Sequence, residues 1–74
     1  MVNIPIKTDY IRLAQLLKLA DAVQDGAEAK FRILNAEVKV NNVLETRRGR
    51  KVGLGDQVEI DGTIYTVVPP DFTT

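Results

Sequence analysis

The chain has 74 residues, and its ten Lys and Arg balance its ten Asp and Glu, so the formal net charge is zero. This length holds one small core, and we expect a single domain, residues 1–74, kept folded by apolar packing. The sequence contains no His, Cys or Ser, which excludes disulfides, the usual zinc ligand sets and Ser–His or Cys–His nucleophile pairs. We therefore expect no enzyme, cofactor or metal site.

No apolar run approaches the roughly 18 residues of a membrane span. The N-terminal stretch M-V-N-I-P-I-K also lacks the basic-then-apolar order of a signal peptide. We expect a soluble cytoplasmic protein.

A first helix is predicted over about residues 9–23, where apolar residues recur at spacings of three and four. They are Leu13, Leu16, Leu17, Ala20 and Val23. Thr8 or Asp9 can cap its first turn. Asp25-Gly26 is the expected stop, because Gly tolerates the left-handed backbone that ends helices.

A second, shorter helix is predicted over residues 27–36. Phe31 and Leu34 fall on its apolar stripe and are expected to face the core, with Lys30 and Arg32 beside that stripe.

At Glu37 the apolar period changes from nearly four to two, which predicts a strand containing Val38 and Val40. Asn41-Asn42 is a turn signal, because Asn tolerates positive φ better than other residues with a side chain. Residues 43–46 can return as a second strand.

The strongest hairpin signal is Asp61-Gly62, between predicted strands at 57–60 and 63–68. A two-residue turn there places Val58 opposite Tyr65. We expect the helices to cover the face of this hairpin that carries Val58, Ile60, Tyr65 and Val67. Together these elements predict an α+β domain in which two N-terminal helices pack on a small, mostly antiparallel sheet.

The charges divide unevenly along the chain. Residues 1–29 carry three cations and four anions, residues 30–51 seven cations and two anions, and residues 52–74 four anions and no cation. At physiological salt, charges separated by much more than about 8 Å hardly cancel. The middle third, with a net charge of +5 from those seven cations and two anions, is the candidate contact surface.

Residues 45–51, which we call the basic segment, contain four of the ten cations: Arg47, Arg48, Arg50 and Lys51. Guanidinium forks match phosphate oxygens, and Gly49 lets a backbone approach closely. A phosphate backbone is one candidate ligand. The alternative is a solvated turn whose charges protect a sheet edge from aggregation. The residues of the segment do not distinguish these two interpretations.

The aromatic residues favour packing over base stacking. They are Tyr10, Phe31, Tyr65 and Phe72, and none lies in the basic segment. Phe31 and Tyr65 fall on predicted core stripes. We therefore expect any nucleic acid to be recognised by its shape and phosphates.

Several motifs stand in the order of a known family: L-L-K-L-A (16–20), G-A-E-A-K (26–30), V-K-V-N (38–41), E-T-R-R-G-R-K-V (45–52) and G-D-Q-V (55–58). The chain resembles the RNA-binding domain of small-subunit ribosomal protein S-four, and most closely the free-standing YaaA/YbcJ-type members of that superfamily. The resemblance covers about residues 3–68 and leaves 69–74 as a tail.

The resemblance implies the S-four-like alpha-L motif, two helices on a curved sheet, in a bacterial, non-catalytic RNA-binding protein. It implies structured RNA, ribosomal or transfer RNA, as the ligand, and the ribosome or its assembly intermediates as further partners. In that family the second helix and the following strand–turn contact RNA. Carried over by position, the contacts are Lys30, Arg32, Arg47, Arg48, Arg50 and Lys51. Lys18 joins them if its side of the first helix faces the same way, and is otherwise ordinary surface charge.

The chain departs from the family where it has Ala36 and Asn42 in place of Gly, and Gly26-Ala27 in place of Ser-Arg. Alanine adopts the left-handed backbone only at a cost, so we expect the turn after the second helix to be shaped differently. Because that arginine is absent, the family's usual RNA register is not carried over to this chain.

Two other functions are compatible with the same charges. One is a protein-interaction module that docks an acidic partner, which would be captured regardless of nuclease treatment. The other is a DNA-binding accessory protein, which matched RNA and DNA hairpins would distinguish, because the 2′-hydroxyl and the A-form shape mark RNA.

Overall fold

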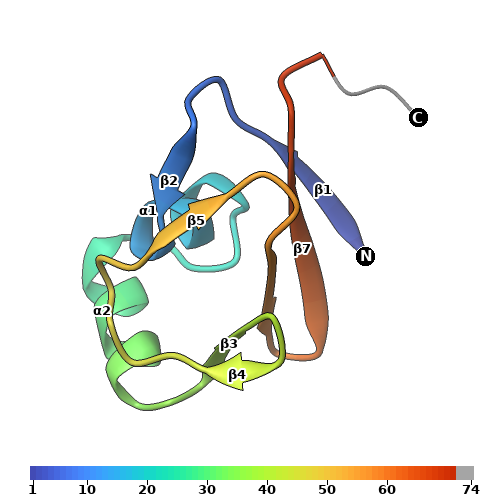
Figure 1. The fold of residues 1–74 in the computed structure, drawn as a ribbon. Helices are drawn as coiled ribbons and strands as arrows, with labels where there is room; N and C mark the ends of the chain where they lie inside the picture. Colours follow the sequence, from blue (N-terminus) through green and yellow to red (C-terminus); the bar gives the residue numbers. More distant parts are fainter. Residues whose placement is uncertain (72–74) are drawn as a thin grey trace.

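The computed structural model describes residues 1–71, and the last three residues of the predicted tail lie outside the described residues. In chain order (Figure 1) the elements are β1 (Val2–Pro5), β2 (Tyr10–Arg12), α1 (Leu13–Leu19), α2 (Gly26–Leu34), β3 (Val38–Val40), β4 (Val43–Leu44), β5 (Lys51–Gly53), β6 (Gln57–Ile60) and β7 (Thr63–Val68). The predicted α+β class, with two helices and a mostly antiparallel sheet, is confirmed.

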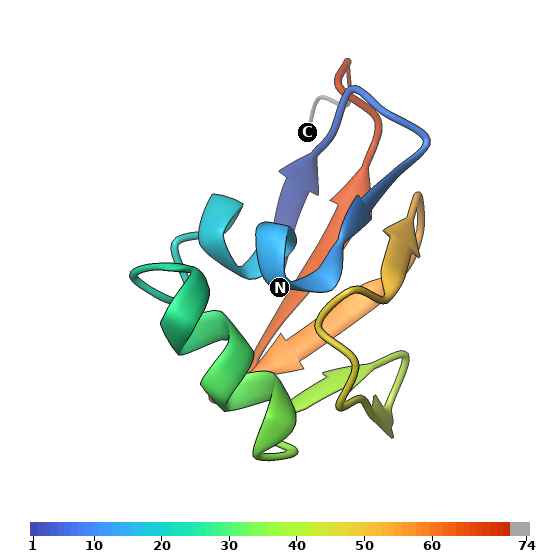
Figure 2. The ribbon, with the colours of Figure 1, turned by 90° about the vertical axis from the view of Figure 1, so that its left-hand side faces the viewer.

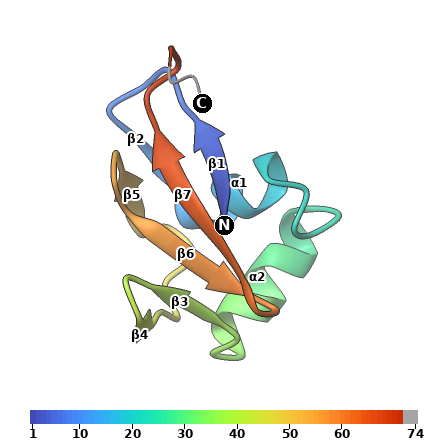
Figure 3. The same ribbon diagram turned by 90° about the vertical axis from the view of Figure 1, so that its right-hand side faces the viewer.

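Five strands form one sheet in the order β1-β7-β6-β3-β4, and β2 and β5 form a separate antiparallel pair. Only β1 and β7 pair in parallel within the larger sheet. Figure 3 shows this sheet in front, with both helices behind one of its faces. The largest fully buried side chains come from the helices, the larger sheet and the β2–β5 pair: Leu13, Leu16, Leu17, Ile33, Val38, Val52, Val58, Ile60 and Val67.

Both predicted hairpin turns are confirmed. Asp61 and Gly62 have φ of 53° and 78°, and Val58 pairs with Tyr65 as expected. Asn41-Asn42 has φ of 52° and 70° between β3 and β4. Positive φ at both central residues gives a turn whose twist matches that of the flanking strands. The strand predicted over 43–46 is shorter and ends at Leu44.

The first helix is shorter than predicted at both ends. It begins at Leu13 because the preceding residues pair with β5 instead, and it ends at Leu19. Neither expected residue caps it: the Thr8 hydroxyl donates to the Tyr10 carbonyl, and Asp9 precedes the strand. The sequence pattern missed β2 because its formation depends on a partner strand about 40 residues away in the chain.

Asp25-Gly26 starts the second helix and does not stop the first. The Asp25 side chain accepts from the Glu28 amide at 2.8 Å, and Glu28 Oε1 accepts from the Gln24 amide at 2.7 Å. The first of these bonds satisfies an amide that the first turn of a helix leaves free, and the second holds the residue before the cap, Gln24, against that turn.

The buried face of α2 also differs from the prediction. Ala29 and Ile33 are buried, whereas Phe31 is 63% exposed and Leu34 is exposed as well. The helix turns the Ala29 and Ile33 side of its surface to the core, so the expectation that Phe31 and Leu34 face the core was wrong.

The turn after α2 keeps the left-handed backbone despite its alanine. Ala36 has a φ of 58°, its amide donates to the Ile33 carbonyl, and the Glu37 amide donates to the Arg32 carbonyl. These two bonds form the Schellman ending that glycine usually permits. The expectation of a differently shaped turn was therefore wrong.

Candidate nucleic-acid interface

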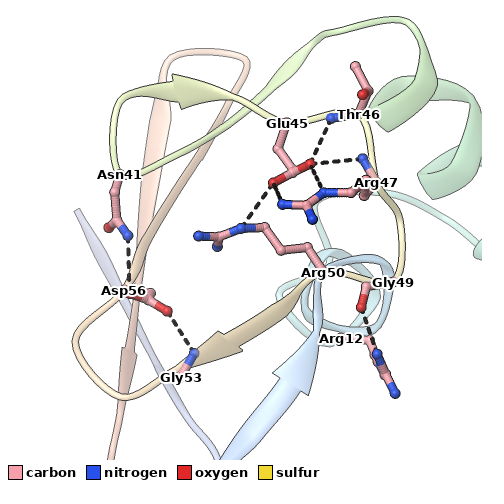
Figure 4. A network of polar contacts seen from close by, with 9 residues as sticks. All are labelled: Arg12, Asn41, Glu45, Thr46, Arg47, Gly49, Arg50, Gly53 and Asp56. Atoms are coloured by element: carbon pink, nitrogen blue, oxygen red, sulfur yellow. Dashed lines mark hydrogen bonds and ion pairs between the residues drawn. The ribbon is translucent and has the colours of Figure 1, made fainter.

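The basic segment is anchored to the start of α1 through three successive backbone carbonyls. Arg48 O and Arg50 O accept from the amides of Ala14 (3.1 Å) and Leu13 (2.9 Å). Gly49 O accepts from Arg12 Nη1 at 2.8 Å (Figure 4). The first two bonds satisfy amides that have no partner within the helix at its start, and all three fix the backbone from which the basic side chains project.

Glu45 is the internal counterion of the segment. It is 9% exposed, and its carboxylate accepts from the Thr46 and Arg47 amides at 3.1 and 3.0 Å. Arg47 Nε and Nη2 donate to it at 3.0 and 3.2 Å, and Arg50 Nε lies 2.9 Å away. Figure 4 shows both guanidinium groups directed at this one carboxylate. Four clustered cations are therefore tolerated partly because one buried anion pairs with two of them.

These bonds keep Glu45 ionised. The side-chain hydrogen bonds from Arg47 are the main cause that lowers the pKa of Glu45 from 4.5 to about 2, against a smaller opposing effect of burial. The same contact raises the pKa of Arg47. The pair therefore stays charged at any physiological pH.

The cations of the segment differ in how much they reach solvent. The Arg47 side chain is 75% exposed although it is paired, whereas that of Arg50 is mostly covered. Arg48 and Lys51 are exposed. Among residues 1–71, the Arg48 side chain has no hydrogen-bond or ion-pair partner, so it is free to meet a ligand.

The two expected cations of α2 have different surroundings. Lys30 is exposed and has no hydrogen-bond or ion-pair partner in the described part of the chain. The Arg32 side chain is 16% exposed and contacts three carboxylates, those of Glu28, Glu37 and Asp61. Its hydrogen bond to Asp61 is the main cause that raises its pKa. Arg32 therefore ties α2 to the β6–β7 turn.

Two neighbours of the basic segment, Tyr10 and Arg12, were missed at the sequence level. The Tyr10 ring centroid lies 4.8 Å from Lys51 Nζ and 5.6 Å from Arg12 Cζ. Both distances are within the range of cation–π attraction. The only sequence signal was the alternation of Tyr10, Ile11 and Arg12, which the helical pattern beginning at the same place obscured.

Lys18 faces the same side as these residues. An open groove of about 820 Å³, which we call the Tyr10 groove, is lined by Thr8, Tyr10, Ile11, Arg12, Gln15, Lys18 and Leu19. Figure 2 shows β2 leading directly into α1, the two elements that supply most of this lining. Lys18 and Arg12 line the same groove, and the bond from Arg12 to Gly49 O connects that groove to the basic segment.

Asn41 and Asp56 are structural residues. Asn41 Nδ2 donates to Asp56 Oδ1 at 3.1 Å, and Asn41 Oδ1 accepts from the Gln57 amide at 3.0 Å. Asp56 Oδ2 also accepts from the Gly53 amide at 2.8 Å. These contacts, drawn in part in Figure 4, join the β3–β4 turn to the end of β5. The motifs V-K-V-N and G-D-Q-V therefore shape the strand ends that hold the basic segment.

Comparison with known proteins places the chain in a family. "Probable ribosome maturation protein RlbA" of Bacillus subtilis (strain 168) is 51% identical over 59 residues, which cover 80% of this chain and 83% of that protein. "Putative RNA-binding protein YbcJ" of Escherichia coli (strain K12) is 37% identical over 62 residues, which cover 84% and 89%. The family model of the S4 domain, the S-four domain that the motifs resemble, matches residues 4–68. The chain therefore belongs to the S4 domain family.

Proposed function

We propose that this protein is a non-catalytic RNA-binding protein that holds structured RNA, ribosomal or transfer RNA, by its phosphates and shape. The observation that carries the proposal is the basic segment itself, whose backbone is fixed on α1 while Arg47 and Arg48 reach solvent. A fixed backbone reduces the conformational entropy lost when those side chains bind phosphates. The names of the relatives, an RNA-binding protein and a ribosome maturation protein, support the same function.

The proposed contact set is narrower than the one expected from the sequence. Lys30, Arg47, Arg48 and Lys51 are the proposed phosphate contacts, with Lys18 at the margin. Arg32 and Arg50 belong to the expected set too, but their guanidinium groups are bound to carboxylates. We assign these two the role of holding α2 and the basic segment in place.

We propose that the protein is cytoplasmic and acts on the ribosome or its assembly intermediates. The relative named as a ribosome maturation protein supports this role. Neither helix within residues 1–71 is long and apolar enough to cross a membrane.

The salt dependence of RNA binding tests the proposal. If about five phosphates are neutralised, the log–log slope of the association constant against salt is roughly −3 to −5. Arg48→Ala should reduce the magnitude of the slope by about 0.7–0.9, the share of one phosphate.

Lys39→Ala is the matched control. Lys39 lies between Val38 and Val40, which are buried under the helices, so its side chain projects from the opposite face of the sheet. This variant loses the same charge and should keep the wild-type slope. Equal slopes for wild type and Arg48→Ala would remove Arg48 from the interface, and a flat response of the wild type would contradict phosphate binding altogether.

A further inference from the structure

We propose that the Tyr10 groove is a subsite for one unpaired nucleotide of the bound RNA. The base would stack on the Tyr10 ring, and its flanking phosphates would meet Arg12, Lys18 and Lys51. The inference rests on the proposed function and adds a ligand class to it. The RNA must present an unpaired base next to the stretch held by the basic segment.

The strand register places the aromatic ring and the cations on one face. Arg12 pairs with Lys51 and Tyr10 pairs with Gly53. Side chains alternate along a strand, so Tyr10 and Arg12 project together while Ile11, between them, packs against the core. The residue opposite Tyr10 is a glycine, so the side chains that lie over the ring are those of the two cations, with Lys51 Nζ 4.8 Å and Arg12 Cζ 5.6 Å from its centroid.

The ring is partly accessible although Lys51 and Arg12 lie over it. Tyr10 is 41% exposed and lines the groove together with Gln15 and Lys18. The other tyrosine in the described residues, Tyr65, packs against the core and does not line the groove. An exposed aromatic face beside cations is the combination with which proteins hold unpaired nucleotides, because any base can stack while the cations bind the backbone.

The subsite is organised before a ligand arrives. Arg12 Nη1 is held by the Gly49 carbonyl, so the basic segment orients the guanidinium beside the ring. Within residues 1–71 this is the only hydrogen bond of the Arg12 side chain, and its remaining N–H groups are available to a phosphate. The groove and the basic segment therefore form one continuous surface through Arg12 and Lys51.

The test compares two labelled RNA hairpins of equal charge, one with an ordinary single-stranded loop and one whose loop residues all lack bases. Wild type should bind the ordinary hairpin roughly tenfold more tightly, because stacking contributes on that order per base. Tyr10→Leu should remove this preference. Tyr10→Phe, which keeps the ring, should retain it.

A measurement on the unmodified protein does not depend on whether the leucine variant folds. The NMR signals of the Tyr10 ring protons should shift when the ordinary hairpin is added, and much less with the base-free hairpin.

Equal binding of the two hairpins by wild type, with no selective shift at Tyr10, would overturn the subsite while RNA binding stands. The subsite would also be overturned if the Tyr10→Leu variant kept the wild-type preference for the ordinary hairpin. If wild type binds neither hairpin, the proposed function fails and the subsite fails with it.

Discussion

The buried carboxylate of Glu45 holds the backbone and two side chains of the basic segment in place. Glu45 binds two guanidinium groups and two backbone amides. Its charge is surrounded by donors, which is the condition under which a covered carboxylate contributes to stability. Glu45, which precedes the cations in the sequence, therefore helps to fix their positions.

Replacing Glu45 by glutamine should lower the free energy of unfolding by about 1–3 kcal/mol at neutral pH, because hydrogen bonds to a charged group are lost. The pKa of Glu45 is lowered in the folded state, so its contribution is complete above the unfolded value of 4.5 and disappears as the pH falls toward about 2. Urea unfolding of wild type and Glu45→Gln at several pH values measures the difference. A difference that stays constant down to the lowest pH would contradict this role.

Ala36 adopts a backbone conformation that suits glycine. With a φ of 58° and an exposed side chain, it incurs a steric cost of about 1–2 kcal/mol. Ala36→Gly removes that cost and loses about 0.4–1 kcal/mol through the freer unfolded chain. We expect a net gain of roughly 0.5–1 kcal/mol in thermal or urea unfolding.

Gly62→Ala is the control for this prediction. Gly62 has a φ of 78°, and an added Cβ would meet no atom within 4 Å. The substitution should therefore destabilise through the backbone alone, by roughly 0.5–1 kcal/mol after the gain from a less free unfolded chain. Loss of stability in Ala36→Gly would mean that the left-handed turn is not strained.

At the scale of elements, the two helices start by different means. Carbonyls of the basic segment satisfy the first amides of α1, whereas the Asp25 side chain caps α2. Asp25→Ala should therefore destabilise the protein by about 1 kcal/mol. Asp9→Ala, at a position the sequence pattern favours as a cap, should change stability by less than about 0.5 kcal/mol. Thermal unfolding of both variants separates the two positions, and equal losses would contradict the assignment.

Elements that depend on neighbouring residues were predictable from the sequence, and elements that depend on distant partners were not. The turns at Asn41-Asn42 and Asp61-Gly62 follow from local residues that tolerate positive φ. The pair β2–β5 joins residues far apart in the chain, and it converts the expected first turn of a helix into a strand. Because the sequence pattern placed Tyr10 and Arg12 in the first helix, it did not predict that they lie on β2 beside the basic segment.

For the whole molecule, a net charge of zero conceals the separation of charge that the proposed function needs. The charge count found the basic segment, but it could not show which cations the fold already uses. Arg32 and Arg50 are bound to carboxylates, whereas Lys30 and Arg48 are exposed. That distinction depends on three-dimensional contacts, as do the exposed positions of Phe31 and Tyr10.

Fluorescence anisotropy of a labelled RNA hairpin and its DNA counterpart measures whether the basic segment and Lys30 bind RNA. Lys30→Ala/Arg48→Ala is the informative variant, because both side chains are exposed and the fold should survive. Lys7→Ala/Lys39→Ala removes equal charge at two exposed lysines outside the proposed contact set. We expect wild type to prefer RNA and only Lys30→Ala/Arg48→Ala to lose most of its affinity. Equal binding of RNA and DNA, or equal losses in the two variants, would contradict it.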